Sequence, residues 1–195
     1  MAGDDAFKDR ERALEEQWAN AEQDKLVEKM REKARLEEIT TALATTLQVD
    51  HPDLLARVVG LGVTMDTGPA LLLAPLVQIA WAEGKVTDDE RAAVLRLAHG
   101  RGLAESSPAY AQLGQWLDER PSDELFDVAI EVIQTAFKGL TAEERDERIA
   151  TFAKACHEVA SASGGGLARL LGMHSGVSAQ EHAILDQIKA SLRAP

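Results

Sequence analysis

The sequence predicts an all-α protein, a helical bundle preceded by a charged helical arm. Two observations carry this prediction. Apolar residues recur at spacings of three and four, most clearly at Leu125, Ala129, Val132 and Ala136, which places them on one face of a helix. Such segments repeatedly begin at a Ser or Thr suited to capping a helix, and no segment reads convincingly as a β-strand.

The composition limits the classes of partner. Of the 195 residues, 45% are hydrophobic and only 4% aromatic, so we expect a core of Leu, Val, Ile and Ala. The formal net charge is −12. We therefore expect no nucleic-acid partner, because binding to phosphates needs a basic face. Proteins and cations remain the electrostatically easier partners.

The cellular location is predicted from three absences in the sequence. The single cysteine, Cys156, excludes an intramolecular disulfide, which fits a reducing compartment. The N-terminal residues are acidic and lack the apolar region of a signal peptide. No run of about 18 apolar residues is present. We expect a cytoplasmic protein that does not insert directly into a membrane.

Residues 1–47 form the predicted arm. Between residues 4 and 39 there are twelve acidic and eight basic residues and no Gly or Pro, a pattern typical of a solvated helix. On a helix, Phe7, Leu14 and Trp18 share one face, whereas Leu26 and Met30 lie on another. A break near Asn20 would reconcile the two faces.

Two interpretations of the arm remain open. It is either an exposed helix without a partner or a helix that binds a partner through Phe7, Leu14 and Trp18. The second interpretation rests on Trp18, because an aromatic side chain buries a large apolar surface when it binds a partner.

Residues 48–195 form the predicted helical domain. Asp50-His51-Pro52 predicts a helix start with Asp50 as the N-cap, and Gly60 and Gly62 end that helix. The next helix covers the apolar run 70–81, in which Pro75 predicts either a late start or a kink.

Further helix starts follow at regular intervals. Ser107-Pro108 and Ser122 each begin a helix, and Thr141 begins a long one that ends near Ala162. Capping boxes, in which a Ser or Thr is followed three residues later by Glu, are predicted at 87–90, 141–144 and 178–181.

One helix–loop–helix unit occurs twice. Residues 79–84 and 159–164 share the pattern apolar-Ala-x-Ala-polar-Gly, and 86–90 and 177–181 share apolar-Thr/Ser-x-x-Glu. The second copy carries an insertion at 165–176. Two such hairpins can bury their apolar faces against each other. Within the insertion, Leu170 and Met173 are predicted partner contacts, because an apolar loop tip either packs on the body or meets another molecule.

The stretch LVQIAWAEGKVTDDERAAVLRLAHGRGL, residues 76–103, resembles the signature of the TerB-like family of tellurite-resistance-associated helical domains. The resemblance covers roughly residues 69–192. It implies an all-α fold of two paired hairpins and a role in the response to tellurite or envelope stress. The sequence departs from the family pattern at Glu83 and at Ser163, where the family has Asp before the glycine.

The stretch FKDRERALEEQWANAEQDKLVEKMR, residues 7–31, resembles the start of the small zeta-type ATPase inhibitors of bacteria. This resemblance implies an arm that regulates an ATPase.

Four acidic residues form the predicted metal site: Glu83, Asp88, Asp89 and Glu90. Divalent cations bind several oxygen ligands, although the spacing is not that of an EF-hand. The alternative is purely structural, because acidic residues favour a helix N-terminus and Glu90 completes a capping box.

No catalytic group is predicted. Cys156, His157, His174 and His182 lack the paired spacing of a zinc site, and adjacent residues on a helix point in different directions, so His157 is no base for Cys156. Neither the glycines at 60 and 62 nor the three glycines at 164–166 match a phosphate-binding loop. We expect no cofactor beyond a divalent cation.

The predicted function is that of a non-enzymatic adaptor that binds other proteins, including membrane-associated ones, with self-association left open. The alternatives are a cation-sensing domain that uses the acidic loop and an ATPase regulator that uses the arm.

Overall fold

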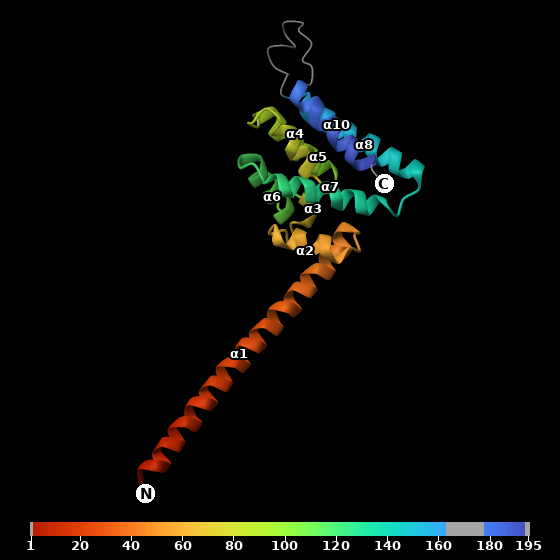
Figure 1. Cartoon of the computed structure of the whole chain (residues 1–195). Coiled ribbons are helices and arrows are strands. Elements are labelled where there is room, and N and C mark those ends of the chain that lie inside the picture. Colours follow the sequence, from red (N-terminus) through yellow and green to blue (C-terminus); the bar gives the residue numbers. More distant parts are fainter. Residues whose placement is uncertain (1, 163–177, 194–195) are drawn as a thin grey trace, which may run out of the picture. The chain divides into compact units, whose positions relative to one another are not determined.

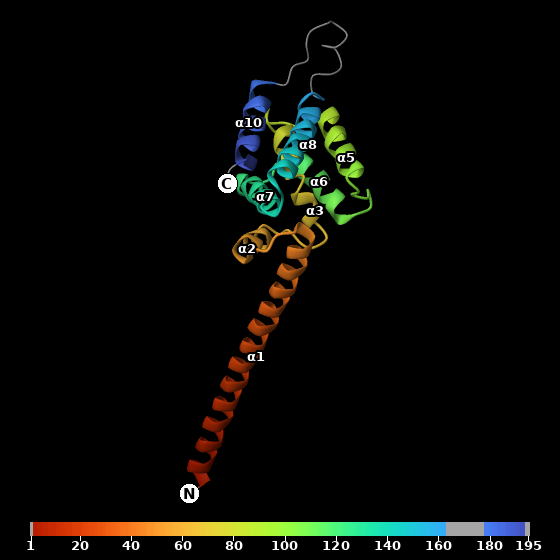
Figure 2. The ribbon, with the colours of Figure 1, turned by 90° about the vertical axis from the view of Figure 1, so that its right-hand side faces the viewer.

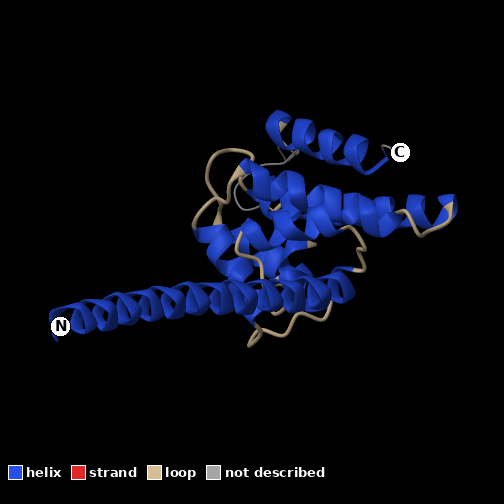
Figure 3. Ribbon diagram, turned by 60° about the horizontal axis from the view of Figure 1, so that its bottom comes forward, coloured by secondary structure: helices blue, strands red, loops and turns tan. Residues whose placement is uncertain are grey.

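The computed structural model describes residues 2–162 and 178–193, and within the first helix it describes the side chains of Trp18 and of residues from Asn20 onward. The elements in this part of the chain are all helical (Figures 1 and 3). They are α1 (Ala2–Leu47), α2 (Pro52–Gly60), α3 (Gly68–Leu71), α4 (Ala74–Ala80), α5 (Asp88–Gly100), α6 (Pro108–Asp118), α7 (Asp123–Phe137), α8 (Ala142–Ala160) and α10 (Ala179–Arg193). The predicted all-α class is confirmed.

The chain divides into two compact units, Met1–Thr41 and Ala42–Pro195. The second unit begins before residue 48, where the sequence placed the start of the domain. The last turn of α1 belongs to this unit because Leu43 and Leu47 are buried in its core.

The helix α1 has no break near Asn20, and that prediction is wrong. The helix contains no Pro, and side-chain pairs such as Lys25 with Glu22 and Lys33 with Glu37 lie along its surface. Because nothing in this sequence interrupts the hydrogen-bonding ladder, the apolar residues stay on separate faces of one helix.

The C-terminus of α1 has a defined cap. Gln48 adopts a positive φ of 56°, and the Val49 N–H donates to the Ala44 carbonyl at 3.1 Å. This is the hydrogen bond of a Schellman motif, in which the residue after the helix is left-handed.

One helix start differs from the prediction, and a second follows one of the two predicted alternatives, the late start. The N-cap of α2 is His51, whose Nδ1 accepts from the Leu54 N–H at 3.2 Å, rather than Asp50. The predicted helix over 70–81 is two short helices, α3 and α4. Pro75 lies in the first turn of α4, where its missing N–H costs no helical hydrogen bond.

The core of the second unit is centred on α4. Its side chains are buried almost throughout, including Leu76, Val77 and Ile79, and it packs against α5, α6, α7, α8 and α10. Figure 2 shows α8 between α10 and α5, and α8 packs against both. The indole N–H of Trp81 donates to the Trp116 carbonyl at 2.8 Å, which joins the end of α4 to α6.

The predicted capping residues at Thr87, Ser107, Ser122 and Thr141 are confirmed, since each side chain accepts from the backbone N–H three residues later. No described helix combines the length and the apolar character needed to cross a membrane.

Candidate functional site

The predicted acidic residues lie around the start of α5. Asp88 and Asp89 occupy its first turn, where acidic side chains favour the helix dipole. Glu90 turns inward and is 2% exposed. Its Oε2 accepts from the Thr87 N–H and from the Thr87 hydroxyl, both at 2.7 Å, while the Glu90 N–H donates back to Thr87 Oγ1. Glu90 therefore closes the predicted capping box.

The second copy of the motif has the same geometry. Glu181 Oε2 accepts from the Ser178 N–H at 2.6 Å, and the Glu181 N–H donates to Ser178 Oγ at 3.2 Å. Glu181 is 1% exposed, and its Oε1 is buried without a hydrogen-bond partner in the described part of the chain. Among the residues that the structure describes, Glu90 and Glu181 are the only buried charged ones.

Burial raises the pKa of Glu90 above its ordinary value, and the charges of Glu181 and Glu83 raise it further. The two hydrogen bonds from Thr87 act in the opposite direction and favour the carboxylate. The competition arises because removal from water disfavours a charge, whereas hydrogen bonds to the charged form stabilise it.

The described residues, 2–162 and 178–193, hold no group of three or more His, Cys, Asp and Glu side chains arranged to bind a metal ion. The cation site at Glu83, Asp88, Asp89 and Glu90 stays a prediction without geometric support in this part of the chain.

Cys156 is a core residue. It lies on α8 fully buried, and burial raises the pKa of its thiol to about 12. A thiol in this state is a poor nucleophile, because the thiolate is the reactive form. His157 on the same helix is exposed.

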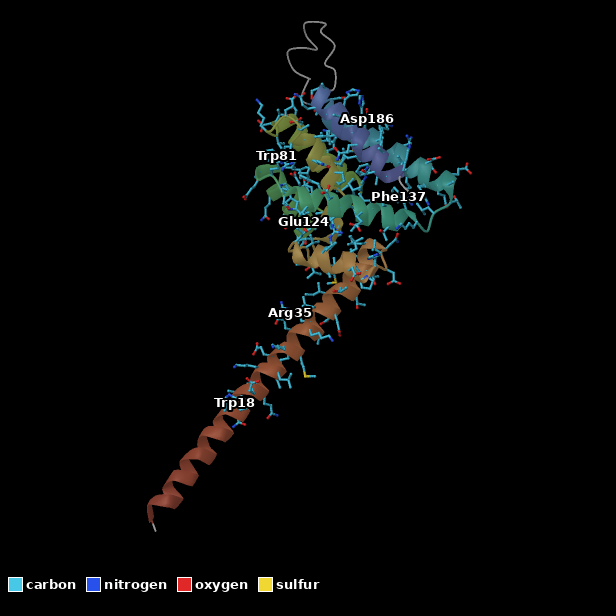
Figure 4. The ribbon with its side chains drawn as sticks, in the orientation of Figure 1. Trp18, Arg35, Trp81, Glu124, Phe137 and Asp186 are labelled. Atoms are coloured by element: carbon cyan, nitrogen blue, oxygen red, sulfur yellow. The ribbon has the colours of Figure 1, made fainter. Side chains whose placement is uncertain are left out.

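The predicted partner contacts fall into three groups. Trp18 is 71% exposed on α1 (Figure 4). Phe7 and Leu14 lie on the same helix, in the stretch whose side chains are outside the described ones. Leu170 and Met173 lie within 163–177, outside the described residues.

The arm exposes further large apolar side chains besides Trp18, which is the one predicted contact of the arm with a described side chain. Every described side chain from Asn20 to Glu38 is exposed. Leu26 is 59%, Met30 65% and Leu36 45% exposed. Leu36 follows Trp18 by five helical turns at 3.6 residues a turn, so the two share one face, while Leu26 and Met30 form a second patch. The signal for Leu36 was the same periodicity that grouped Phe7, Leu14 and Trp18, carried further along the helix.

A cavity of about 330 Å³ lies within the second unit. Its apolar lining comes from the end of α1, the segment between α3 and α4, α7 and α8, and includes Leu47, Leu73, Ile133, Phe137, Leu140 and Phe152. Figure 4 shows Phe137 at the end of α7. Arg101, which follows α5, and Arg148 on α8 line its polar side, together with Thr46, Gln48 and Thr151. The sequence did not predict this cavity, because its residues are far apart in the chain and each looks like an ordinary helix residue.

Comparisons with known proteins give no relative from which to assign a function: no protein-family model, no curated protein and no solved structure matches the chain.

Proposed function

We propose that the protein is a non-enzymatic helical adaptor that binds another protein through the apolar residues of α1. The observation that carries the proposal is the distribution of exposed apolar side chains. Of the six large hydrophobic side chains that are exposed in the described residues, five lie on α1, at Trp18, Leu26, Val27, Met30 and Leu36, and the sixth is Met65.

Exposed apolar side chains on a charged helix are suited to a helical partner. Apolar positions along one face can insert between the side chains of a facing helix, while mixed charges on either side set the orientation of the pair. Tryptophan is among the residues that most often dominate binding energy at interfaces. Trp18 and Leu36 form the longer face, and Leu26 with Met30 offers a second.

The resemblance to TerB-like domains supports assigning the second unit a scaffolding role in this adaptor, and the proposed setting is a response to tellurite or envelope stress. The capped helices on which the resemblance rests are present in α5 and α10, where Thr87 and Ser178 close capping boxes with Glu90 and Glu181.

The test is an affinity capture from host lysate with membranes retained, using the full chain and a Trp18→Ala/Leu36→Ala variant. We expect the variant to lose a protein that the natural chain retains. Met65→Ala is the matched control, because Met65 is 50% exposed but lies outside α1. Equal recovery by all three chains would contradict the proposal.

Sedimentation of the purified chains separates binding of a different protein from self-association. If the natural chain self-associates and the double variant is monomeric, the exposed face joins copies of this chain, and the adaptor proposal fails.

A further inference from the structure

The cavity in the second unit combines an apolar interior with two guanidinium groups. Its floor is formed by side chains that are buried or half-buried, such as Leu73, Ile133 and Phe152. Arg101 and Arg148 lie in the same lining, and both residues are exposed at the surface. None of the described residues that line the cavity is Asp or Glu.

We propose that this cavity binds a small amphipathic carboxylate, with its apolar chain against Ile133, Phe137 and Phe152 and its carboxylate at Arg101 and Arg148. This binding site is separate from the exposed residues of α1 and does not depend on the adaptor function.

The arginines at the cavity differ in their ion pairing from four other arginines of this unit. Those four form ion pairs, Arg57 with Glu131, Arg91 with Asp118, Arg96 with Glu158 and Arg120 with Asp123, whereas Arg145 and Arg193 have no such partner among the described residues and lie outside the cavity lining. Within residues 2–162 and 178–193, neither Arg101 nor Arg148 has an ion-pair partner. The two arginines at the cavity are therefore available to an anion from outside, and the fork geometry of a guanidinium suits a carboxylate.

The nearby carboxylates are held elsewhere. Glu158 acts electrostatically on Arg101 but bonds to Arg96 at 3.0 Å. Arg148 acts on Glu144, whose Oε2 accepts from the Thr141 N–H and hydroxyl, both at 2.8 Å. Although Arg101 is exposed as a residue, partial burial of its guanidinium lowers its pKa. An anion beside this guanidinium would compensate part of the lost solvation.

The volume of the cavity and the charge of the chain limit the size and charge of the ligand. A volume of about 330 Å³ is at the lower end of the range for small-molecule pockets. The chain has a formal net charge of −12, and this charge repels an acidic protein more strongly than a single carboxylate. A small monoanion therefore fits the cavity better than an acidic segment of a partner protein does.

The experiment is a titration of the full chain with octanoate, in which binding is measured by calorimetry and by the chemical shifts of backbone amides in NMR spectra. Octyltrimethylammonium has the same alkyl chain with the opposite charge, and acetate has the carboxylate without the chain. We expect saturable binding of octanoate, with shifts at Leu73, Ile133 and Phe137, and affinity at least about tenfold weaker for either control ligand. In a series of fatty acids, affinity should rise by up to about fourfold for each added methylene until the cavity is filled.

Variants test the two arginines separately. Arg101→Gln and Arg148→Gln should each weaken octanoate binding by about tenfold, which is typical for loss of a charged hydrogen-bond donor. Arg120→Gln is the matched control, because Arg120 is also exposed but is paired with Asp123 away from the cavity lining. Far-UV circular dichroism checks that all three variants are folded.

Several outcomes would overturn the proposal. The proposal fails if octanoate shows no saturable binding, if octanoate and octyltrimethylammonium bind with equal affinity, or if all three arginine substitutions have the same effect. Shifts confined to residues 18–38 would place the alkyl chain on the exposed arm instead. If a peptide ending in Asp-Leu binds at the cavity and octanoate does not, the cavity is a site for a protein partner.

Discussion

Glu90 and Glu181 occupy the same position in two capping boxes, and both carboxylates are buried in the bundle, where burial raises the pKa of Glu90 and the charge of Glu181 adds a smaller increase. The two residues belong to the two copies of the internal repeat. Their interaction shows that the repeat brings together two like charges inside the protein. Because like charges in a poorly solvated site repel each other, protonation of Glu90 relieves part of this repulsion.

The raised pKa of Glu90 predicts a dependence of stability on pH. The folded chain binds the Glu90 proton more tightly than the unfolded chain, so the contribution of Glu90 to the free energy of unfolding falls as pH rises above about 4.5. Glu90→Gln keeps an oxygen that accepts from Thr87 but does not ionise. We expect the stability of the natural chain relative to this variant to decrease from pH 4.5 to pH 7, measured by urea unfolding.

Glu144 is the matched control for this prediction, because it closes a capping box at the surface. Hydrogen bonds from the Thr141 backbone and side chain lower its pKa. Its contribution to stability is therefore present above its unfolded pKa and lost as the pH falls through its folded pKa. Glu144→Gln should show the opposite trend with pH, and the same trend in both variants would contradict this account.

Removal of the caps should destabilise the second unit. Thr87→Ala removes the hydroxyl that donates to Glu90 Oε2 and accepts from the Glu90 N–H. We expect a loss of about 1–2 kcal/mol in the free energy of unfolding, since the carboxylate that loses one of its two donors is buried. Thr141→Ala, at an exposed cap, should cost less, and a larger loss there would contradict the role assigned to burial.

Substitution of two aromatic residues distinguishes a residue of the core from a residue of the proposed binding surface. Phe126 on α7 is 1% exposed, and Trp18 on α1 is 71% exposed. Phe126→Ala should lower the free energy of unfolding by about 3–5 kcal/mol through loss of core packing. Trp18→Ala should change it by no more than about 0.5 kcal/mol. A large loss of stability in the Trp18 variant would show that Trp18 is part of a core.

Glycine substitutions test the backbone at Gly84, between α4 and α5, and at Gly60, the last residue of α2. Gly84 has a φ of +80° with nothing within 4 Å of an added Cβ, so Gly84→Ala should cost about 1 kcal/mol or slightly more through backbone strain alone. Gly60 also has open space but no positive φ. Gly60→Ala should stabilise the chain by about 0.4–1 kcal/mol, because alanine restricts the unfolded state. Thermal melts of both variants distinguish these effects.

The reactivity of Cys156 reports on the core of the second unit. Its thiol is fully buried and its pKa is raised to about 12. We expect no reaction with a disulfide reagent at pH 8 in the folded chain and full reaction in denaturant. Rapid modification of the folded chain would show that α8 opens readily or packs differently.

Local features of the fold were predictable from the sequence because they depend on neighbouring residues. The capping boxes at Thr87 and Thr141 and the cap at Ser122 satisfy backbone N–H groups within the same helix turn. The break before α4 was foreseen as one alternative, since Pro75 cannot lie in a helix interior without loss of a hydrogen bond. The cap at His51 was missed because an imidazole nitrogen takes the capping role that the carboxylate of Asp50 was expected to take one residue earlier.

By itself the sequence therefore determined the all-α class, most helix starts and the position of Trp18 on a charged helix. The tertiary structure decided that Glu90 and Glu181 are buried and interact, and that Arg101 and Arg148 line one apolar cavity. It also decided that the last turn of α1 packs in the second unit, through Leu43 and Leu47. The physical reason is distance along the chain: caps and periodicity act within a few residues, whereas charge repulsion in a core and the shape of a cavity depend on which helices pack together.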